Sequence, residues 1–91
     1  MTRSVLVTGA SKGIGRAIAL RLAADGFTII AHYHSDRPGA EQTVAQIVEA
    51  GGSARVMGFD IADRQQCREQ LEQDIEQHGA YYGVVSNAGI T

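Results

Sequence analysis

The sequence predicts an α/β fold, a doubly wound parallel sheet with helices on both faces. Short β-branched and aliphatic runs alternate with longer segments of helical period, in the order β-α-β-α-β-α-β. Glycines stand at the junctions, 11 among 91 residues, against a single proline. Strands that alternate with helices are joined by right-handed crossovers and therefore lie parallel. We expect the first four strands and three helices of such a fold.

The first strand is the apolar run VLV at residues 5–7, which is typical of a strand buried on both faces. Over residues 13–25 the apolar period becomes helical, because isoleucine and leucine recur every four residues. Gly26 follows at the position where a helix commonly ends. These residues therefore predict a strand followed by an amphipathic helix.

The second strand is predicted over residues 27–33, FTIIAHY, which are rich in β-branched and aromatic side chains. Ser35 or Asp36 can cap the helix that follows, since both carry a side-chain oxygen for a free backbone N–H. Pro38 fits the first turn of that helix. The pair Gly51-Gly52 ends it.

The third strand is predicted over residues 54–59, with Asp60 at its carboxyl end. Asp63 can cap the third helix, and Gln66 stands three residues later as the partner of a capping box. A glycine then closes the helix, and residues 82–86 predict the fourth strand.

Composition narrows the classes of function. Lys and Arg number 8 against 10 Asp and Glu, and this net charge of −2 favours neither nucleic acid nor an anionic membrane surface. No apolar window reaches the roughly 18 residues of a membrane span. Cys67 is the only cysteine, so no intrachain disulfide is expected, and we predict that this thiol is buried and inert in a cytoplasmic protein. His32 and His34 share one face of a strand but have no third ligand, so we predict no metal site.

A glycine-rich loop joins the first strand to the first helix, with the sequence TGASKGIG at residues 8–15. Gly9 allows a sharp turn, Gly13 lets the backbone approach a ligand, and Gly15 permits close packing of helix on strand. The following helix start attracts an anion. The spacing is neither G-x-G-x-x-G nor that of a P-loop. We predict a loop that holds a ligand phosphate.

Three motifs resemble the short-chain dehydrogenase/reductase family. TGASKGIG at 8–15 is similar to its TGxxxGxG cofactor motif, and residues 86–89 are similar to its NNAG motif with Ser86 in place of the first Asn. Asp60-Ile61 resembles the family's adenine-contacting Asp. The motifs extend over nearly all 91 residues. The wording TGASKGIGRAIA and NAGIT is nearest to the 3-oxoacyl-[acyl-carrier-protein] reductases.

The resemblance implies that residues 1–91 are the N-terminal part of one NADP(H)-binding Rossmann domain, whose remainder lies outside this chain. Asp60 would accept a hydrogen bond from the adenine amino group, Asn87 would tie the fourth strand to its neighbours, and residues 88–89 would run beside the ribose. The implied cofactor-binding residues are Gly9, Ser11, Lys12, Gly13, Ile14, Gly15, Asp60, Ile61, Asn87, Ala88 and Gly89.

The end of the second strand predicts the choice of cofactor. An acidic residue there would bind the ribose 2′-OH of NAD and repel a 2′-phosphate. By register with the family this position is Tyr33, which is not acidic, and His34, Ser35 and the nearby Lys12 suit a phosphate. Asp36 is assigned to capping the next helix. We therefore predict NADP(H) over NAD, with His34 at the cofactor.

The resemblance also implies an activity for the full-length parent, a homotetramer that reduces a 3-oxoacyl-[acyl-carrier-protein] with NADPH to the 3-hydroxyacyl form. The family's catalytic Tyr-x-x-x-Lys pair cannot occur here, because Lys12 is the only lysine and Thr8 precedes it by four residues. We assign no catalytic residue to this chain.

Other functions stay open at this level. The alternatives are a reductase of another ketone, sugar or steroid, a non-catalytic nucleotide-binding module, and a flavodoxin-like or methyltransferase domain of the same layer class. The physical argument against a free-standing module is coverage of the sheet. The third helix alone would cover one face, so we expect poorly covered apolar faces on the first and fourth strands.

Overall fold

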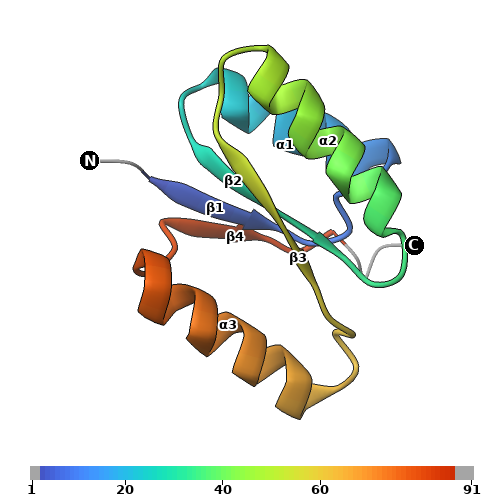
Figure 1. Ribbon diagram of the computed structural model, residues 1–91, viewed down its shortest axis with the longest axis vertical. Helices are drawn as coiled ribbons and strands as arrows, with labels where there is room; N and C mark the ends of the chain where they lie inside the picture. Colours follow the sequence, from blue (N-terminus) through green and yellow to red (C-terminus); the bar gives the residue numbers. More distant parts are fainter. Residues whose placement is uncertain (1–2, 88–91) are drawn as a thin grey trace.

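The computed structural model describes residues 3–87 as a sheet sandwiched between helices (Figure 1). α1 and α2 lie on one face of the sheet and α3 lies on the other. The predicted fold class and the predicted order of elements are confirmed. The elements are β1 (Ser4–Val7), α1 (Gly13–Ala24), β2 (Thr28–Tyr33), α2 (Arg37–Glu49), β3 (Ala54–Gly58), α3 (Arg64–His78) and β4 (Gly83–Val85).

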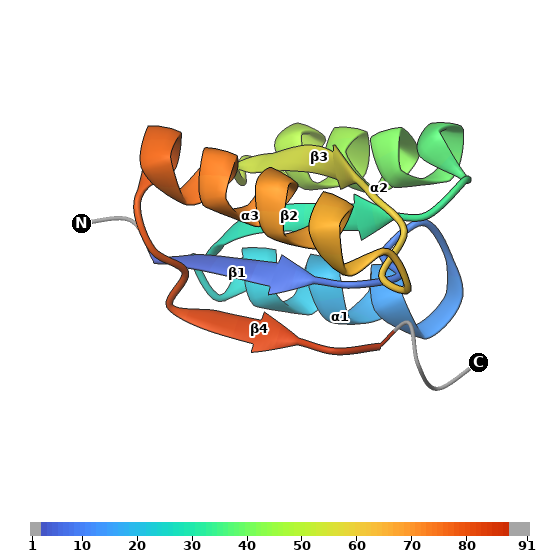
Figure 2. The same ribbon diagram turned by 90° about the horizontal axis from the view of Figure 1, so that it is seen from below.

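The four strands are parallel and follow the order β3-β2-β1-β4. Val5 lies opposite Ile29 of β2 and Gly83 of β4, so β1 has a partner on each side. The chain moves outward from β1 to β3 and then returns to the other side of β1. Parallel α/β sheets bind ligands at such a reversal, beyond the carboxyl ends of the strands. All four carboxyl ends point to the same edge of the sheet (Figure 2).

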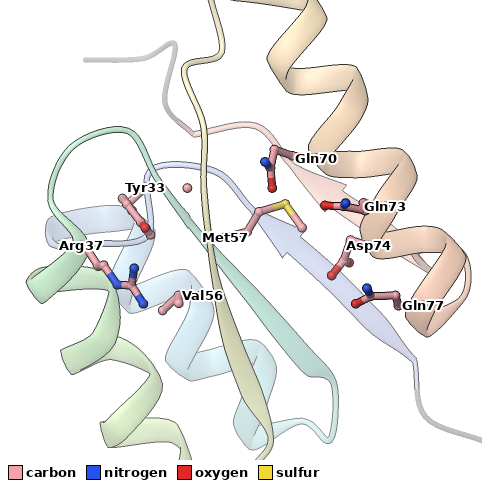
Figure 3. Close-up of a pocket in the computed structure, with 9 residues that line it drawn as sticks. Tyr33, Arg37, Val56, Met57, Gln70, Gln73, Asp74 and Gln77 are labelled. Carbon is pink, nitrogen blue, oxygen red and sulfur yellow. The ribbon is translucent and has the colours of Figure 1, made fainter.

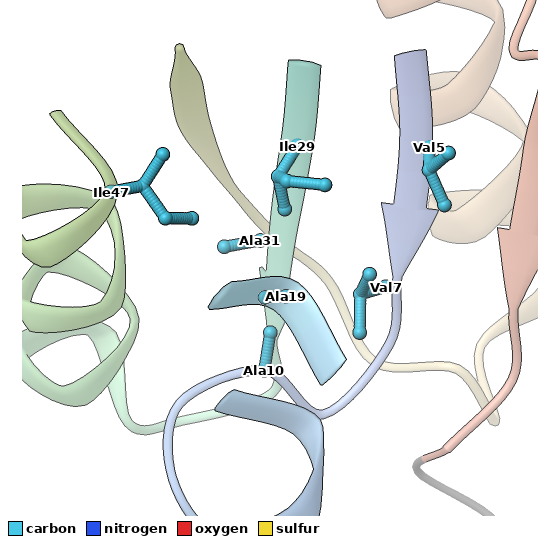
Figure 4. Close-up of a cluster of buried hydrophobic side chains, with 7 residues drawn as sticks. All are labelled: Val5, Val7, Ala10, Ala19, Ile29, Ala31 and Ile47. Carbon is cyan, nitrogen blue, oxygen red and sulfur yellow. The ribbon is translucent and has the colours of Figure 1, made fainter. Parts of the chain in front are cut away.

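The main core lies between the sheet and the pair α1 and α2. Side chains of β1 and β2 meet small alanines of the glycine loop and α1, which allow the helix to approach the sheet closely (Figure 4). Ile47 reaches this core from α2 and is almost completely buried. The buried members of the core are Val5, Val7, Ala10, Ala19, Ile29, Ala31 and Ile47.

The opposite face of the sheet has a thinner cover. Its buried cluster consists of Leu6, Ile30, Met57 and Phe59, and α3 contributes only partly buried side chains such as Cys67. The prediction of a buried Cys67 was therefore wrong, because α3 has no fully buried residue.

Poor cover was expected over the apolar faces of the first and fourth strands, and it is present only on the fourth. Val84 of β4, on the same sheet face as Leu6, is 60 % exposed, as expected of a poorly covered apolar face. The same expectation for the first strand was wrong. Val5, Leu6 and Val7 are all buried, because β2 and β4 flank β1 and both layers of helices reach it.

Aspartates begin two of the helices. Asp36 accepts a hydrogen bond from the Gly39 N–H at 3.0 Å, and Asp63 accepts one from the Gln66 N–H at 3.0 Å. Both satisfy donors that have no partner inside the helix. The expected capping box was wrong in one respect. The side-chain amide oxygen Oε1 of Gln66 accepts the N–H of Asp60 instead of the N–H of Asp63, which already donates to the Asp60 carbonyl.

A polar cluster ties α3 to the sheet. Arg55 of β3 donates two hydrogen bonds to the Asp74 carboxylate, at 3.0 and 2.7 Å, and the Tyr81 hydroxyl donates a third at 2.7 Å. Burial acts to raise the pKa of Asp74, but the hydrogen bonds from Arg55 and Tyr81 outweigh it and lower the pKa below 3.8. This ion pair is mostly shielded from water and therefore contributes more than an exposed pair.

We expect Asp74→Asn to lower the free energy of unfolding by about 2 kcal/mol at neutral pH, because charged hydrogen bonds are lost from a shielded site. The folded-state pKa of Asp74 is depressed, so its stabilisation is present above pH 3.8 and is lost as the pH falls below that value. Urea unfolding at several pH values measures the gap in the free energy of unfolding between the wild type and Asp74→Asn. Glu72→Gln, on an exposed position of α3, is the control. A gap that stayed constant down to acid pH would contradict this assignment.

Candidate functional site

A cavity of about 680 Å³ opens at the carboxyl edge of the sheet, with Gly9 after β1 and Asn87 after β4 among its lining residues. Its walls come from four places: the glycine loop, the end of β2, the segment after β3 and the segment after β4. Sequence-distant segments meet here because parallel strands bring their carboxyl ends to one edge. The lining residues are Gly9, Ser11, Lys12, Gly13, Ile14, His32, His34, Ser35, Asp36, Asp60, Ile61 and Asn87.

Glycine is required at three places in the loop, for two different reasons. Gly9 and Gly13 have φ values of +64° and +62°, a backbone conformation that other residues rarely adopt. Gly15 has an ordinary backbone, but a Cβ there would overlap the carbonyl oxygen of Gly9. The start of α1 therefore packs directly against the turn that leaves β1.

The loop is also held from the β4 side. Asn87 donates its backbone N–H to the Thr8 hydroxyl at 2.7 Å and its side-chain amide to the Gly9 carbonyl at 3.2 Å. The Thr8 hydroxyl in turn donates to the Val85 carbonyl at 3.2 Å. Asn87 thus links the segment after β4 to the glycine turn, a tie of the kind that the family resemblance implied.

Two residues that the sequence did not indicate, Thr43 of α2 and Arg16 of α1, also hold the loop. The Thr43 hydroxyl donates to the Ala10 carbonyl at 2.7 Å. The Arg16 guanidinium donates to the carbonyl of Ser11 and, at 2.9 Å, to the Thr43 hydroxyl. The partners lie 27 and 33 residues apart for the pairs Arg16–Thr43 and Thr43–Ala10, so no local pattern could have revealed them.

α1 begins differently from the other two helices in residues 3–87. Its N-cap is Lys12, which makes no capping hydrogen bond with its side chain, whereas α2 and α3 are capped by aspartates. The first N–H groups of a helix have no partner inside it, and they carry the positive end of the helix dipole. At α1 these groups face the cavity across Gly13 and Ile14. This end of α1 can accept an anion from the cavity.

The outer rim combines polar and apolar side chains. Lys12 and His34 are exposed, and the imidazole Nε2 of His34 lies 3.7 Å from the Asp60 carboxylate. The other Asp60 oxygen accepts the Ala62 N–H at 2.9 Å. Ile14 and Ile61 are 66 % and 44 % exposed, although both are large and apolar. Two such side chains on one cavity suit a flat ring between the polar groups.

A second hollow of about 340 Å³ lies along the free edge of β3 (Figure 3). Tyr33 and Arg37 reach it from one side, and Gln70, Gln73 and Gln77 of α3 reach it from the other. Tyr33 faces this hollow because its ring covers Gly58, where a Cβ would overlap it. Tyr33 is therefore absent from the cavity at the glycine loop, while the next residue, His34, lines it.

The cavity brings together most of the residues proposed for the cofactor. Gly15 lies beneath the loop and shapes it without lining the cavity. Ala88 and Gly89 lie outside the described residues. His32, Ser35 and Asp36 line the cavity although they were not among the assigned site residues. The nine predicted residues on its wall are Gly9, Ser11, Lys12, Gly13, Ile14, His34, Asp60, Ile61 and Asn87.

Within residues 3–87, no three His, Cys, Asp or Glu side chains lie close enough together to hold a metal ion. No helix in this described part of the chain combines the length and apolar character needed to cross a membrane.

The parallel order β3-β2-β1-β4, with a glycine loop between β1 and α1, defines the chain as a Rossmann-type α/β protein. The family model described as short chain dehydrogenase matches residues 3–91, and the chain belongs to this family.

Among curated proteins, it is 50 % identical over 91 residues to the 3-oxoacyl-[acyl-carrier-protein] reductase FabG of Aggregatibacter actinomycetemcomitans, covering all of this chain and 38 % of that protein. It is 38 % identical to FabG of Staphylococcus aureus strain Mu50, again over the whole chain and 37 % of that protein. The chain thus spans less than two fifths of the length of these relatives.

Solved structures give the same fold. The chain superposes on acetoin dehydrogenase YohF from Salmonella typhimurium with a TM-score of 0.84 and 32 % identity, over 94 % of this chain and 36 % of that one. A short chain dehydrogenase from Mycobacterium avium gives a TM-score of 0.83 and 34 % identity, over 93 % and 33 % of the two chains.

We expect Gly15→Ala to lower the free energy of unfolding by about 2 kcal/mol or more, because the new methyl group meets backbone atoms of Gly9 that have no room to move. Chemical denaturation measures the loss. Gly83→Ala is the matched control, since a Cβ at Gly83 meets nothing within 4 Å. Equal stability of the two variants would show that the turn and α1 are not packed as described.

Proposed function

We propose that the protein carrying this segment reduces a ketone with NADPH, and that residues 1–91 supply the half of the site that binds the cofactor's adenosine and pyrophosphate. The observation that carries the proposal is the start of α1. It lacks a side-chain cap, follows the glycine turn and opens onto a cavity of about 680 Å³. When bound, NADPH supplies the hydride for the reduction.

The pyrophosphate is assigned to the glycine loop. Its oxygens would accept hydrogen bonds from the first N–H groups of α1, where the helix dipole favours negative charge. Gly13 presents bare backbone to the cavity, because it has no side chain and its φ is positive. The bonds from Asn87 and Thr43 hold the loop carbonyls away from this subsite.

The adenine is assigned to the segment after β3. Asp60 has a carboxylate oxygen toward His34 that can also accept a proton of the adenine amino group, while its other oxygen holds the Ala62 N–H. Ile14 and Ile61 provide exposed apolar surface for the two faces of the ring. Together these residues favour a flat heterocycle with an exocyclic amino group.

The choice of NADPH over NADH rests on charge at the end of β2. Tyr33 turns toward the other hollow, and Lys12, His34 and Ser35 line the cavity there. Asp36 also lines it, but one of its oxygens is held by the Gly39 N–H as a helix cap. A lysine, an imidazole and a hydroxyl are suitable donors to a 2′-phosphate.

The substrate is proposed from the relatives, of which two are 3-oxoacyl-[acyl-carrier-protein] reductases at 50 % and 38 % identity. The proposed reaction converts a 3-oxoacyl group on acyl carrier protein to the 3-hydroxyacyl form. Lys12 is the only lysine of this chain, so a Tyr-x-x-x-Lys pair for proton delivery would come from residues outside it. We also propose a homotetrameric, cytoplasmic protein.

We expect Lys12→Ala to weaken NADPH binding about tenfold and to change NADH binding little, because only NADPH carries the 2′-phosphate. Fluorescence titration of both cofactors measures the two dissociation constants. Arg21→Ala is the control, since Arg21 is an exposed cation in the last turn of α1. An equal loss for both cofactors would assign Lys12 to the pyrophosphate or the fold, and tighter binding of NADH by the wild type would overturn the cofactor proposal.

The proposed reaction is tested with the whole protein that carries this segment, by following NADPH oxidation at 340 nm with a 3-oxoacyl-acyl-carrier-protein and with acetoin-type ketones as competing substrates. We expect kcat/KM to be highest for the carrier-bound thioester, because the relatives named for that reaction match the whole length of this chain. A clear preference for a small free ketone would contradict the substrate while leaving the reductase class intact. No oxidation with any ketone would contradict the enzyme itself.

A further inference from the structure

His32 is a polar side chain placed inside a largely apolar wall of the site. It is 1 % exposed, on β2, and its ring lies 4.3 Å from that of Phe59. A buried imidazole is costly unless its nitrogens have partners. Both nitrogens of His32 have one, and the two partners belong to different parts of the chain.

The two partners determine the form of the ring. Nδ1 lies 3.1 Å from the Gly9 backbone N–H, which can only donate, so Nδ1 is the acceptor. Nε2 lies 2.8 Å from the Phe59 carbonyl oxygen, which can only accept, so Nε2 carries the proton. His32 is therefore the neutral Nε2–H tautomer, and the imidazolium form would have no acceptor for Gly9.

The same ring connects two halves of the cavity. Gly9 is the turn from which the glycine loop begins, and Phe59 directly precedes Asp60 and Ile61 at the end of β3. The backbone of His32 adds a third link, because its carbonyl accepts the Ala10 N–H at 2.8 Å. These bonds therefore fix the positions of both the glycine loop and the end of β3 relative to β2.

We infer that His32 is a positioning residue for the cofactor site, which as a neutral imidazole holds the Gly9 turn in register with the end of β3. This rests on the proposed function, since the loop is the proposed pyrophosphate subsite and residues 60–61 the proposed adenine subsite. His32 touches the cofactor through neither nitrogen, because both are already occupied.

A pH dependence follows from the tautomer. Protonation at Nδ1 would place one N–H donor opposite another, that of Gly9. The hydrogen bond between them would be lost and the turn would be released. Burial lowers the pKa of His32 below its ordinary 6.5, and His34 lowers it further, against a smaller opposing effect of the Phe59 bond. The release therefore occurs as the pH falls below 6.5. The titratable groups that line the same cavity as His32 are Lys12, His34, Asp36 and Asp60, and the thiol of Cys67 on α3 packs against the cluster that contains Phe59.

A second histidine, His34, also lines the cavity. It is exposed, and its Nε2 lies 3.7 Å from the Asp60 carboxylate. The effect of His32 is therefore measured as the ratio of the NADPH dissociation constants of the wild type and His32→Asn, which both retain His34.

The test uses NADPH titrations of the wild type, His32→Ala and His32→Asn between pH 5 and 8. The alanine variant leaves the Gly9 N–H and the Phe59 carbonyl without partners, and we expect about tenfold weaker binding at pH 7.5. Asparagine places an amide oxygen where Nδ1 stood and restores the part of the affinity that the Gly9 bond provides, because its shorter side chain does not replace the bond to the Phe59 carbonyl. Its binding relative to the wild type rises as the pH falls below 6.5, because it cannot be protonated there. His78→Asn, at an exposed histidine of α3, is the matched control.

The inference is overturned if His32→Ala binds NADPH as the wild type does, or if the wild type and His32→Asn share one pH profile. Should the alanine variant fail to fold, the pH dependence of the ratio between the NADPH dissociation constants of the wild type and His32→Asn decides alone.

Nitrogen-15 spectra of the histidine rings and of the Gly9 amide give a readout without cofactor. A neutral Nε2–H ring whose titration moves the Gly9 amide supports the contact, and an Nδ1–H ring overturns it. Absence of NADPH binding by the wild type at every pH contradicts the proposed function and leaves that spectral test standing.

Discussion

The site depends on the close contact between the Gly9 turn and the first turn of α1. A Cβ on Gly15 would occupy the place of the Gly9 carbonyl oxygen, so the helix begins only a few atoms from the end of β1. That proximity directs the uncapped end of α1 into the cavity at the sheet edge. The hydrogen bonds that cross to the loop from Asn87, Thr43 and His32 all support this one arrangement.

The two faces of the sheet serve different purposes. The face under α1 and α2 holds a continuous core of aliphatic and alanine side chains, which supports the glycine loop from below. The face under α3 has a smaller cluster and depends more on the polar group of Arg55, Asp74 and Tyr81. Val84 remains well exposed on this face, at the edge strand β4. In the relatives, this length of chain is less than two fifths of the protein.

Different elements around the cavity contribute different kinds of binding group. The end of α1 provides backbone donors for an anion, Lys12 and His34 provide positive or polar groups at the rim, and Ile61 provides apolar surface. In the proposed reaction these residues would bind and orient the cofactor, and none of them is assigned to proton delivery. Membership of the short-chain dehydrogenase family is carried by the match over residues 3–91.

The sequence by itself determined the order of the elements, the parallel sheet and the location of the glycine loop. These follow from local signals: apolar period, helix caps such as Asp36 and Asp63, and glycines at turns. Only the tertiary structure decided the partner of Gln66, the partial exposure of Cys67 and the direction of Tyr33 away from the cavity at the glycine loop. The bonds of His32 belong to this second group. Its partners lie 23 and 27 residues away, and no local pattern encodes which strand ends meet when the sheet assembles.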